Sequence, residues 1–152
     1  MEYGGLTMSG TDIAAVLGGR KVLGRATATA FEFTDLIEKG LPHSALEHVK
    51  TALKLTDREV SNALDISGKT VSRLRRASGH RLSPSISDRL YRFARLYALA
   101  EEVLEDKDQA RDWLRSPQTG LNNRTPIDLM RTEAGAREVE SLLVRIEYGV
   151  LS

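Results

Sequence analysis

A short run of basic and hydroxyl-bearing side chains in the middle of the chain has the chemistry to bind DNA. Lys69 and Arg73 can donate hydrogen bonds to guanine edges or phosphates, and Thr70 can contact a phosphate or a thymine methyl group. These three side chains are expected to face the major groove from one helix. Arg76, His80 and Arg81 beyond them are expected at phosphates. The predicted DNA-contacting residues are Ser67, Lys69, Thr70, Ser72, Arg73, Arg76 and Arg81.

Two short helices must hold this basic face at the surface. Thr56 followed by Glu59 has the capping-box pattern that starts a helix, and Ser67 can cap the next helix. Asp65 occupies the turn between them, where a left-handed glycine is usual, and Asp tolerates that conformation better than most residues. The pattern predicts a helix-turn-helix that projects its second helix outward. The residues that anchor it inward are Val60, Leu64, Ile66, Val71 and Leu74.

Charge is distributed unevenly along the chain, although the net charge is only +1. Residues 67–95 hold eight basic residues and one acidic residue, a net charge of +7, whereas the segments before and after carry −2 and −4. A basic block between acidic ones can attract phosphate locally while the whole protein stays nearly neutral. A solvated basic helix face gives the same count, so charge alone leaves both interpretations open.

Several classes of protein are disfavoured by the composition. The chain of 152 residues has no cysteine, so disulfides and thiolate metal sites are excluded. It has no apolar run approaching the roughly 20 residues of a transmembrane helix and no secretory signal pattern, and we expect a cytoplasmic protein without a membrane partner. His43, His48 and His80 lack metal-ligand spacing, and we interpret them as surface or capping residues. We therefore expect no metal, no cofactor and no enzymatic activity.

Helical patterns recur along the chain and predict an all-α fold of about eight helices. Ser83-Pro84 begins a long helix that is apolar over a wide arc, so we expect it to be covered on two sides. Ser44 with Glu47 resembles another capping box, and residues 20–29 are expected to be irregular. We divide the chain into a partly helical N-terminal segment that could dimerise (1–40), a helix-turn-helix domain (41–95) and a smaller helical module (96–152).

The last helix and the tail suggest a second binding surface. Val139, Leu142, Leu143 and Ile146 share one helix face, which suits either a core or an interface. The tail at 148–152 leaves a tyrosine and two aliphatic residues at a terminus, where chains normally fray. Apolar residues in such a place suggest cover by a partner's groove.

From about residue 41 to the end, over two-thirds of the chain, the sequence resembles the Xre/MbcA/ParS family of type II antitoxins. The helix-turn-helix part of the resemblance is carried by Gly40-Leu41-Pro42 and Ile66-Ser67-Gly68-Lys69-Thr70-Val71-Ser72-Arg73. The C-terminal part is carried by Trp113-Leu114, Ser116-Pro117, Thr125-Pro126-Ile127-Asp128-Leu129 and Arg145-Ile146-Glu147-Tyr148-Gly149. Residues 1–40 have no matching motif.

The resemblance implies an Xre-like helix-turn-helix domain followed by a small helical toxin-binding domain. Its partner would be a RES-domain toxin that degrades NAD, whose active site the antitoxin would occlude. The complex would bind the promoter of its own operon and repress it. The residues expected at the toxin are Val139, Leu143, Arg145, Ile146, Glu147, Tyr148, Val150, Leu151 and Ser152.

Two other functions remain open from the sequence. One is a stand-alone helix-turn-helix transcriptional repressor with a C-terminal dimerisation module, and the other is a protein-interaction module whose helix-turn-helix is vestigial. A single helix-turn-helix covers a short half-site, so we expect a homodimer. One candidate surface for it is the N-terminal segment with Phe31, Phe33, Leu36 and Ile37.

Overall fold

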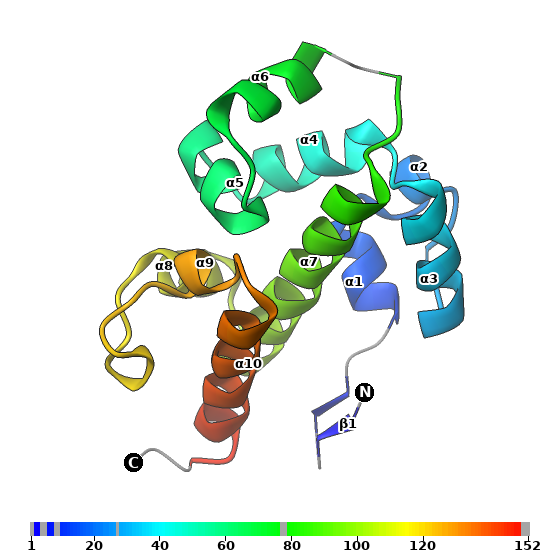
Figure 1. Cartoon of the computed structure of the whole chain (residues 1–152). Coiled ribbons are helices and arrows are strands. Elements are labelled where there is room, and N and C mark those ends of the chain that lie inside the picture. Colours follow the sequence, from blue (N-terminus) through cyan, green and yellow to red (C-terminus); the bar gives the residue numbers. More distant parts are fainter. Residues whose placement is uncertain (1, 4–5, 8–9, 27, 77–78, 150–152) are drawn as a thin grey trace.

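The computed structural model describes residues 2–3, 6–7, 10–26, 28–76 and 79–149 (Figure 1). The chain begins with a two-residue antiparallel ladder and three helices: β1 (Glu2–Tyr3), β2 (Leu6–Thr7), α1 (Gly10–Val16), α2 (Gly19–Leu23) and α3 (Ala30–Lys39). Thr29 and Glu32 form a capping box at the start of α3. Its end is fixed by Gly40, which has a positive φ of 93° and lies so close to the Leu82 carbonyl that a Cβ would be 2.2 Å from it.

The middle of the chain forms three short helices, α4 (His43–Ala52), α5 (Asp57–Leu64) and α6 (Gly68–Arg76). Leu46, Val49 and Leu53 are buried on one side of α4, as the helical spacing predicts. The expected capping box at Ser44 is wrong. The helix begins two residues earlier than that box requires, and its N-cap is Pro42, which makes no side-chain cap hydrogen bond.

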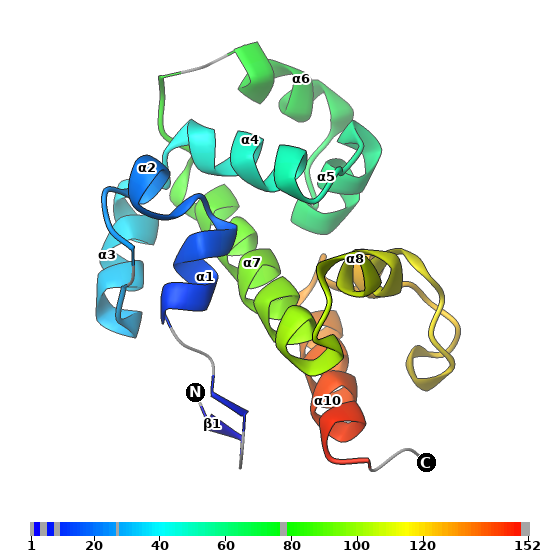
Figure 2. The same ribbon diagram turned by 180° about the vertical axis from the view of Figure 1, so that it is seen from behind.

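One long helix, α7 (Pro84–Leu104), organises the molecule. Ser83 caps it, and proline occupies its first turn, where no backbone donor is needed. It packs against α1, α3, α5, α8 and α10, so the expected cover on two sides is confirmed. Figures 1 and 2 show it crossing the molecule from the helix-turn-helix to the C-terminal helices.

The remaining chain builds a small helical layer against α7. Its elements are α8 (Lys107–Arg115), the 3-10 turn η1 (Thr119–Leu121), α9 (Pro126–Leu129) and α10 (Glu133–Glu147). Asp106, Thr125 and Thr132 cap α8, α9 and α10 through side-chain oxygens that accept from the backbone. Buried residues from α7, α8, α9 and α10 join the cluster that also contains the helix-turn-helix core, so both parts share one hydrophobic core.

The predicted fold class, an all-α Xre-like helix-turn-helix followed by a small helical domain, is confirmed. Two details differ from expectation. Residues 20–29 are not wholly irregular, because α2 occupies 19–23 between two left-handed glycines, Gly18 and Gly24. The described N-terminal residues also contain the short β1–β2 ladder. None of the helices in the described ranges is both long and apolar enough to cross a membrane.

Candidate DNA and partner interfaces

The predicted DNA-contacting face lies on α6, which stands at one extremity of the molecule (Figure 1). Val71 is 2% exposed and Leu74 packs against the core, so they hold one side of this helix to the protein. The opposite side presents polar groups to solvent. The exposed residues on and just before it include Ser67, Lys69, Ser72, Arg73 and Arg76, while Thr70 is half-buried.

The start of α6 is fixed by hydroxyl groups. The Ser67 Oγ accepts a hydrogen bond from the Thr70 backbone N–H at 3.1 Å and lies 2.9 Å from the Thr70 Oγ1. This is the N-cap that the sequence predicted. The contact between the two hydroxyls and the cap hydrogen bond fix the first turn of the helix. Lys69 lies in that turn.

The turn before α6 has the predicted backbone conformation. Asp65 lies in the left-handed region at φ 51° and ψ 52°. The Ile66 backbone N–H donates to the Ser61 carbonyl at 3.1 Å, and the Ser61 hydroxyl donates to the Ile66 carbonyl. The Thr56 hydroxyl accepts from the Glu59 N–H at 3.1 Å, and the Glu59 carboxylate accepts from the Thr56 N–H at 2.9 Å. The capping box at α5 is therefore confirmed.

Arg75, in the last turn of α6, and Arg81, beyond the helix, both interact with other groups of the protein. Arg75 pairs with Asp57 at 2.7 Å, and Lys50 pairs with the same carboxylate. The hydrogen bond from Lys50, with support from Arg75, lowers the pKa of Asp57 below its usual 3.8. Arg81 donates to the Gly40 carbonyl at 2.7 Å. Arg81 is nonetheless exposed, so its remaining donors stay accessible.

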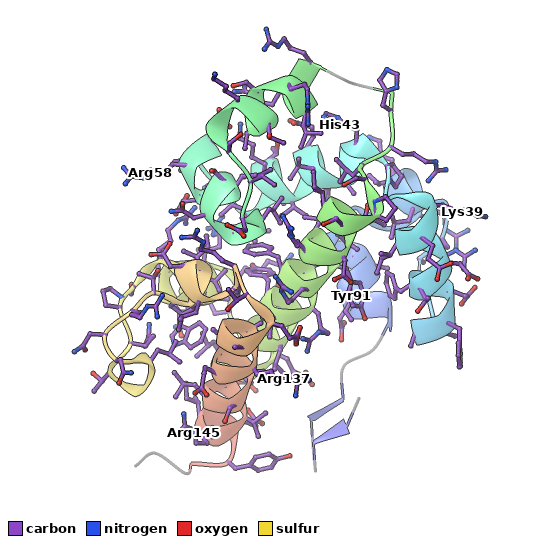
Figure 3. The ribbon with its side chains drawn as sticks, in the orientation of Figure 1. Lys39, His43, Arg58, Tyr91, Arg137 and Arg145 are labelled. Carbon is purple, nitrogen blue, oxygen red and sulfur yellow. The ribbon has the colours of Figure 1, made fainter. Side chains whose placement is uncertain are left out.

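Sequence reasoning missed one exposed cation beside this face. Arg58 lies in the first turn of α5 and projects outward from the body of the protein (Figure 3). Arg58 belongs to residues 1–66, whose net charge is negative, so a count of charge along the sequence does not single it out. The capping box at Thr56 was the local signal that could have placed it at a helix N-terminus.

The basic block at 67–95 contributes less charge to the surface near α6 than its count suggests. Arg89 donates to the carbonyls of Leu64 and Asp65, both at 3.1 Å. Arg92 donates to two carbonyls at the end of α9, and Arg95 pairs with Glu140 of α10 at 2.6 Å. These three α7 arginines bind groups on or next to α5, α9 and α10, which is a structural role.

A polar junction joins the helix-turn-helix to the C-terminal helices. Arg115 of α8 donates to the Glu59 carboxylate at 2.7 Å and to the carbonyls of Leu53 and Lys54 at 3.1 and 2.6 Å. Burial acts to raise the pKa of Glu59, but the hydrogen bonds from Arg115 and the Thr56 backbone outweigh it, so the pKa is lowered. Arg131 also bonds Asp65 at 3.1 Å. Arg115 and Arg131 thus link the start of α5 and the turn after it to the C-terminal module.

The structure describes six of the nine residues expected at a toxin, and they fall into three groups by exposure. Val139 and Leu143 are both 0% exposed, which assigns them to the core, and they offer no surface to a partner. Ile146 is half-buried and packs against that core. Arg145 is also half-buried, and its Nε atom is buried without a hydrogen-bond partner (Figure 3).

Glu147 and Tyr148 are exposed, the latter by 46%. Val150, Leu151 and Ser152 lie outside the described residues.

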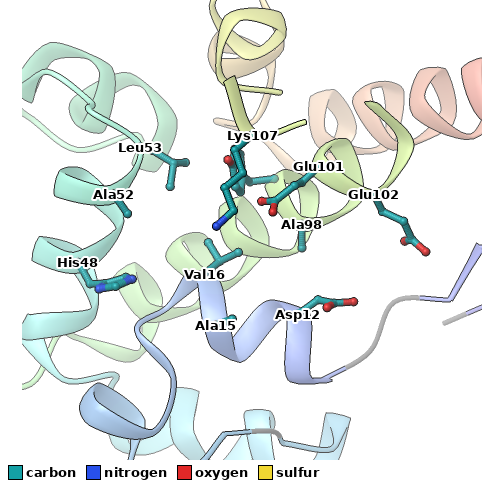
Figure 4. Close-up of a pocket in the computed structure, with 11 residues that line it drawn as sticks. Asp12, Ala15, Val16, His48, Ala52, Leu53, Ala98, Glu101, Glu102 and Lys107 are labelled. Carbon is teal, nitrogen blue, oxygen red and sulfur yellow. The ribbon is translucent and has the colours of Figure 1, made fainter. Parts of the chain in front are cut away.

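A cavity of about 410 Å³ lies between α1, α4 and α7 (Figure 4). Glu101 and Lys107 are among its lining residues, with His48 on the α4 side. Tyr97 also lines it, and burial together with the neighbouring Glu101 carboxylate raises its pKa to about 12. Tyr97 is therefore neutral at any ordinary pH. Among the described residues, no three His, Asp or Glu side chains gather as a metal site.

Comparison with known proteins matches both halves of this arrangement. Residues 32–95 match the antitoxin Xre-like helix-turn-helix domain, and residues 99–149 match the antitoxin Xre/MbcA/ParS C-terminal toxin-binding domain. An "Antitoxin Xre" of Yersinia enterocolitica is 33% identical over 78% of this chain and 80% of its own length. One of Photorhabdus laumondii is 28% identical over 87% of this chain and 89% of its own length.

A third relative, an "Antitoxin Xre" of Pseudomonas putida, is 36% identical over 41% of this chain and 40% of its own length. The two matched domains meet inside α7, with residues 96–98 between them. Both the domain order and the near full-length relatives agree with the geometry above. The chain therefore belongs to the Xre family of type II antitoxins.

Proposed function

We propose that this antitoxin neutralises a RES-domain, NAD-degrading toxin with its C-terminal end and represses its own operon through α6. The observation that supports it most is the separation of two surfaces on one framework. The exposed basic face of α6 and the last turn of α10 lie at opposite ends of the molecule (Figures 1 and 2). A protein of this shape can hold operator DNA and a toxin at the same time.

At the DNA end, we assign the base-facing role to Lys69, Thr70 and Arg73. Ser67 and Ser72 border that face, and we place both beside the backbone phosphates. Arg76 and Arg81 would bind phosphate, joined by Arg58. Each charge-assisted contact to a phosphate adds to affinity in a salt-dependent way, whereas contacts to base edges add specificity.

At the toxin end, we propose that Arg145, Ile146, Glu147 and Tyr148 line the interface together with the tail 150–152. The exposure of Glu147 and Tyr148 and the unpartnered buried Nε of Arg145 support this assignment. We propose a cytoplasmic location, because NAD and operon DNA both occur there. Occlusion of the toxin's active site requires the antitoxin to bind, not to catalyse a reaction.

We also propose that the protein acts as a homodimer, because a single helix-turn-helix reads only a half-site. The N-terminal segment supports this, since Phe31 on α3 is 85% exposed. We propose that a second subunit covers this side chain, whereas Phe33 lies in the core. Sedimentation equilibrium of the Phe31→Glu variant tests it, and an unchanged dimer would move the interface elsewhere.

Two variants separate the two activities in one experiment. Arg73→Ala should weaken binding to the native operator by about 1–3 kcal/mol in a gel-shift titration, because it removes a direct DNA contact. Deletion of residues 148–152 should abolish protection of cells that express the product of the adjacent gene, yet leave operator affinity unchanged. The matched control is Arg137→Ala, which removes the same charge from an exposed position on α10.

Each alternative function predicts a different pattern. A stand-alone repressor would shift promoter DNA but never protect cells. A pure interaction module would protect cells but would not shift promoter DNA. A tail deletion that still protects cells would overturn the proposed toxin interface, and unchanged operator affinity of Arg73→Ala would overturn the placement of α6.

A further inference from the structure

A cavity of about 480 Å³ lies at the N-terminus of α4. Its walls come from the first turns of α4, from Arg75 near the end of α6 and from residues 79–81 before α7. Among the proposed DNA and toxin contacts, Arg81 alone lines this cavity, and a contact to a backbone phosphate needs no enclosed space. The cavity is therefore a feature that those two functions leave unexplained.

His43 provides the first sign that the cavity holds a ligand. It was expected at the surface or at a cap, but it is only 4% exposed, unlike His48 and His80 (Figure 3). It lines the cavity, and its Nε2 atom has no hydrogen-bond partner. Buried polar atoms in proteins are nearly always hydrogen-bonded, so this nitrogen calls for a partner from outside the chain.

Glu47, one helical turn further along α4, provides the second sign. Its Oε1 atom is buried without a hydrogen-bond partner and it lines the same cavity. An ionised carboxylate only accepts hydrogen bonds, so a ligand beside it must carry a donor. The ligand must also carry acceptors, because the two arginines that line the cavity only donate.

The donors favour an anion. Arg75 and Arg81 both line the cavity, and each guanidinium has five N–H groups, of which the Asp57 pair and the Gly40 hydrogen bond use only some. The N-terminus of α4 adds a positive helix-dipole end, and Pro42 makes no side-chain cap hydrogen bond there. An anion that also carries a proton matches both the arginines and Glu47.

We propose that this cavity binds a phosphate group with an ionisable P–OH, either inorganic phosphate or the phosphate monoester of a small metabolite. A phosphate monoester has a second pKa of about 6, so near neutrality it retains a donating P–OH in part of its population. That hydroxyl bonds Glu47, while the other oxygens accept from His43 and the two arginines. A phosphodiester of the DNA backbone offers tetrahedral oxygens but no such proton, and Glu47 repels it.

Comparing phosphate with sulfate tests this assignment, because sulfate has the same shape but carries no proton near neutrality. We expect inorganic phosphate to shift the imidazole resonances of His43 in the full-length protein saturably, about fivefold more tightly than sulfate at equal ionic strength. Glu47→Gln should abolish that preference. Glu38→Gln, at an exposed site on α3, is the matched control and should keep it.

The DNA arm of the experiment identifies the source of the anion. If sulfate binds as well as phosphate, and Glu47→Gln tightens both sulfate and operator DNA, the cavity holds a backbone phosphodiester and the monoester assignment is wrong. If neither anion shifts His43 while thermal unfolding shows the protein folded, the cavity is not an anion site. Operator affinity of Glu47→Gln that stays unchanged, with phosphate preference lost, supports a free phosphate monoester.

Discussion

Asp65 shows how one residue can satisfy two requirements at the turn between α5 and α6. Its backbone is left-handed, which disfavours most side chains, and its carboxylate bonds Arg131 at 3.1 Å. Both partners of this ion pair are about half exposed, so solvent and salt screen most of its energy. The conformation of the backbone should therefore dominate the effect of replacing this residue.

Replacing Asp65 by alanine and by glycine separates these two effects. Glycine relieves the left-handed strain that alanine suffers, so Asp65→Gly should be more stable than Asp65→Ala by about 1 kcal/mol in urea unfolding. At Glu38, in the right-handed backbone of α3, the same pair should show the opposite order by about 1 kcal/mol. Equal stabilities at Asp65 would show that the turn relaxes.

At the scale of elements, the junction between α9 and α10 depends on a close backbone contact. Gly135 is buried in the first turn of α10, and a Cβ there would lie 2.0 Å from the Leu129 carbonyl oxygen. This oxygen belongs to the backbone of α9, so it cannot rotate away as a side chain could. The glycine thus sets how closely the two helices approach.

Gly135→Ala should lower the free energy of unfolding by about 3 kcal/mol, because the methyl group forces α9 and α10 apart. Gly68→Ala makes the same change in the first turn of α6, where nothing lies within 4 Å, and should be neutral or stabilising by up to about 1 kcal/mol. Urea titration of both variants measures the difference. A Gly135→Ala protein as stable as Gly68→Ala would mean that the helices reposition freely.

Elements with local signals were predictable from the sequence. The capping pairs at Thr56 and Ser67, the turn at Asp65 and the proline start of α7 all involve residues within a few positions of each other, and the structure has each of them. The one-turn helix α2 was missed, because the glycines that flank it are typical of loops.

Contacts between distant elements could not be predicted. Arg115 and Glu59 are 56 positions apart, and nothing in either segment marks them as partners. The burial of His43 depends on residues 79–81 folding back over α4, with the His43 N–H bonded to the His80 carbonyl. Whether Val139 and Leu143 face a core or a partner likewise depended on the position of α7.

For the molecule as a whole, Arg115 ties the C-terminal module to the end of α4 and the start of α5 at once. Arg115→Met keeps the aliphatic stem but loses the ion pair and both carbonyl contacts, and should destabilise the protein by about 2–3 kcal/mol. Arg137→Met, whose side chain is 77% exposed, should change stability by less than about 0.5 kcal/mol.

The loss of stability at acid pH should differ between Arg115→Met and the unaltered protein. The folded-state pKa of Glu59 is lowered, so its contribution to stability is complete above the ordinary value of 4.5 and is lost as pH falls through the lowered pKa. Between about pH 6 and about pH 3, Arg115→Met should therefore lose less stability on acidification than the unaltered protein. Parallel pH profiles would show that Glu59 draws its stabilisation from the Thr56 backbone alone.

The unbroken course of α7 sets a distance. Its 21 residues, at 1.5 Å of rise each, span about 30 Å from the helix-turn-helix to the C-terminal helices. The helix is bound on several sides and contains no proline beyond its first turn, so it acts as a rigid spacer rather than a hinge. A partner bound at the end of α10 would therefore stay at a fixed distance from a partner bound at α6. Even a bulky partner at α10 would then leave the exposed face of α6 accessible.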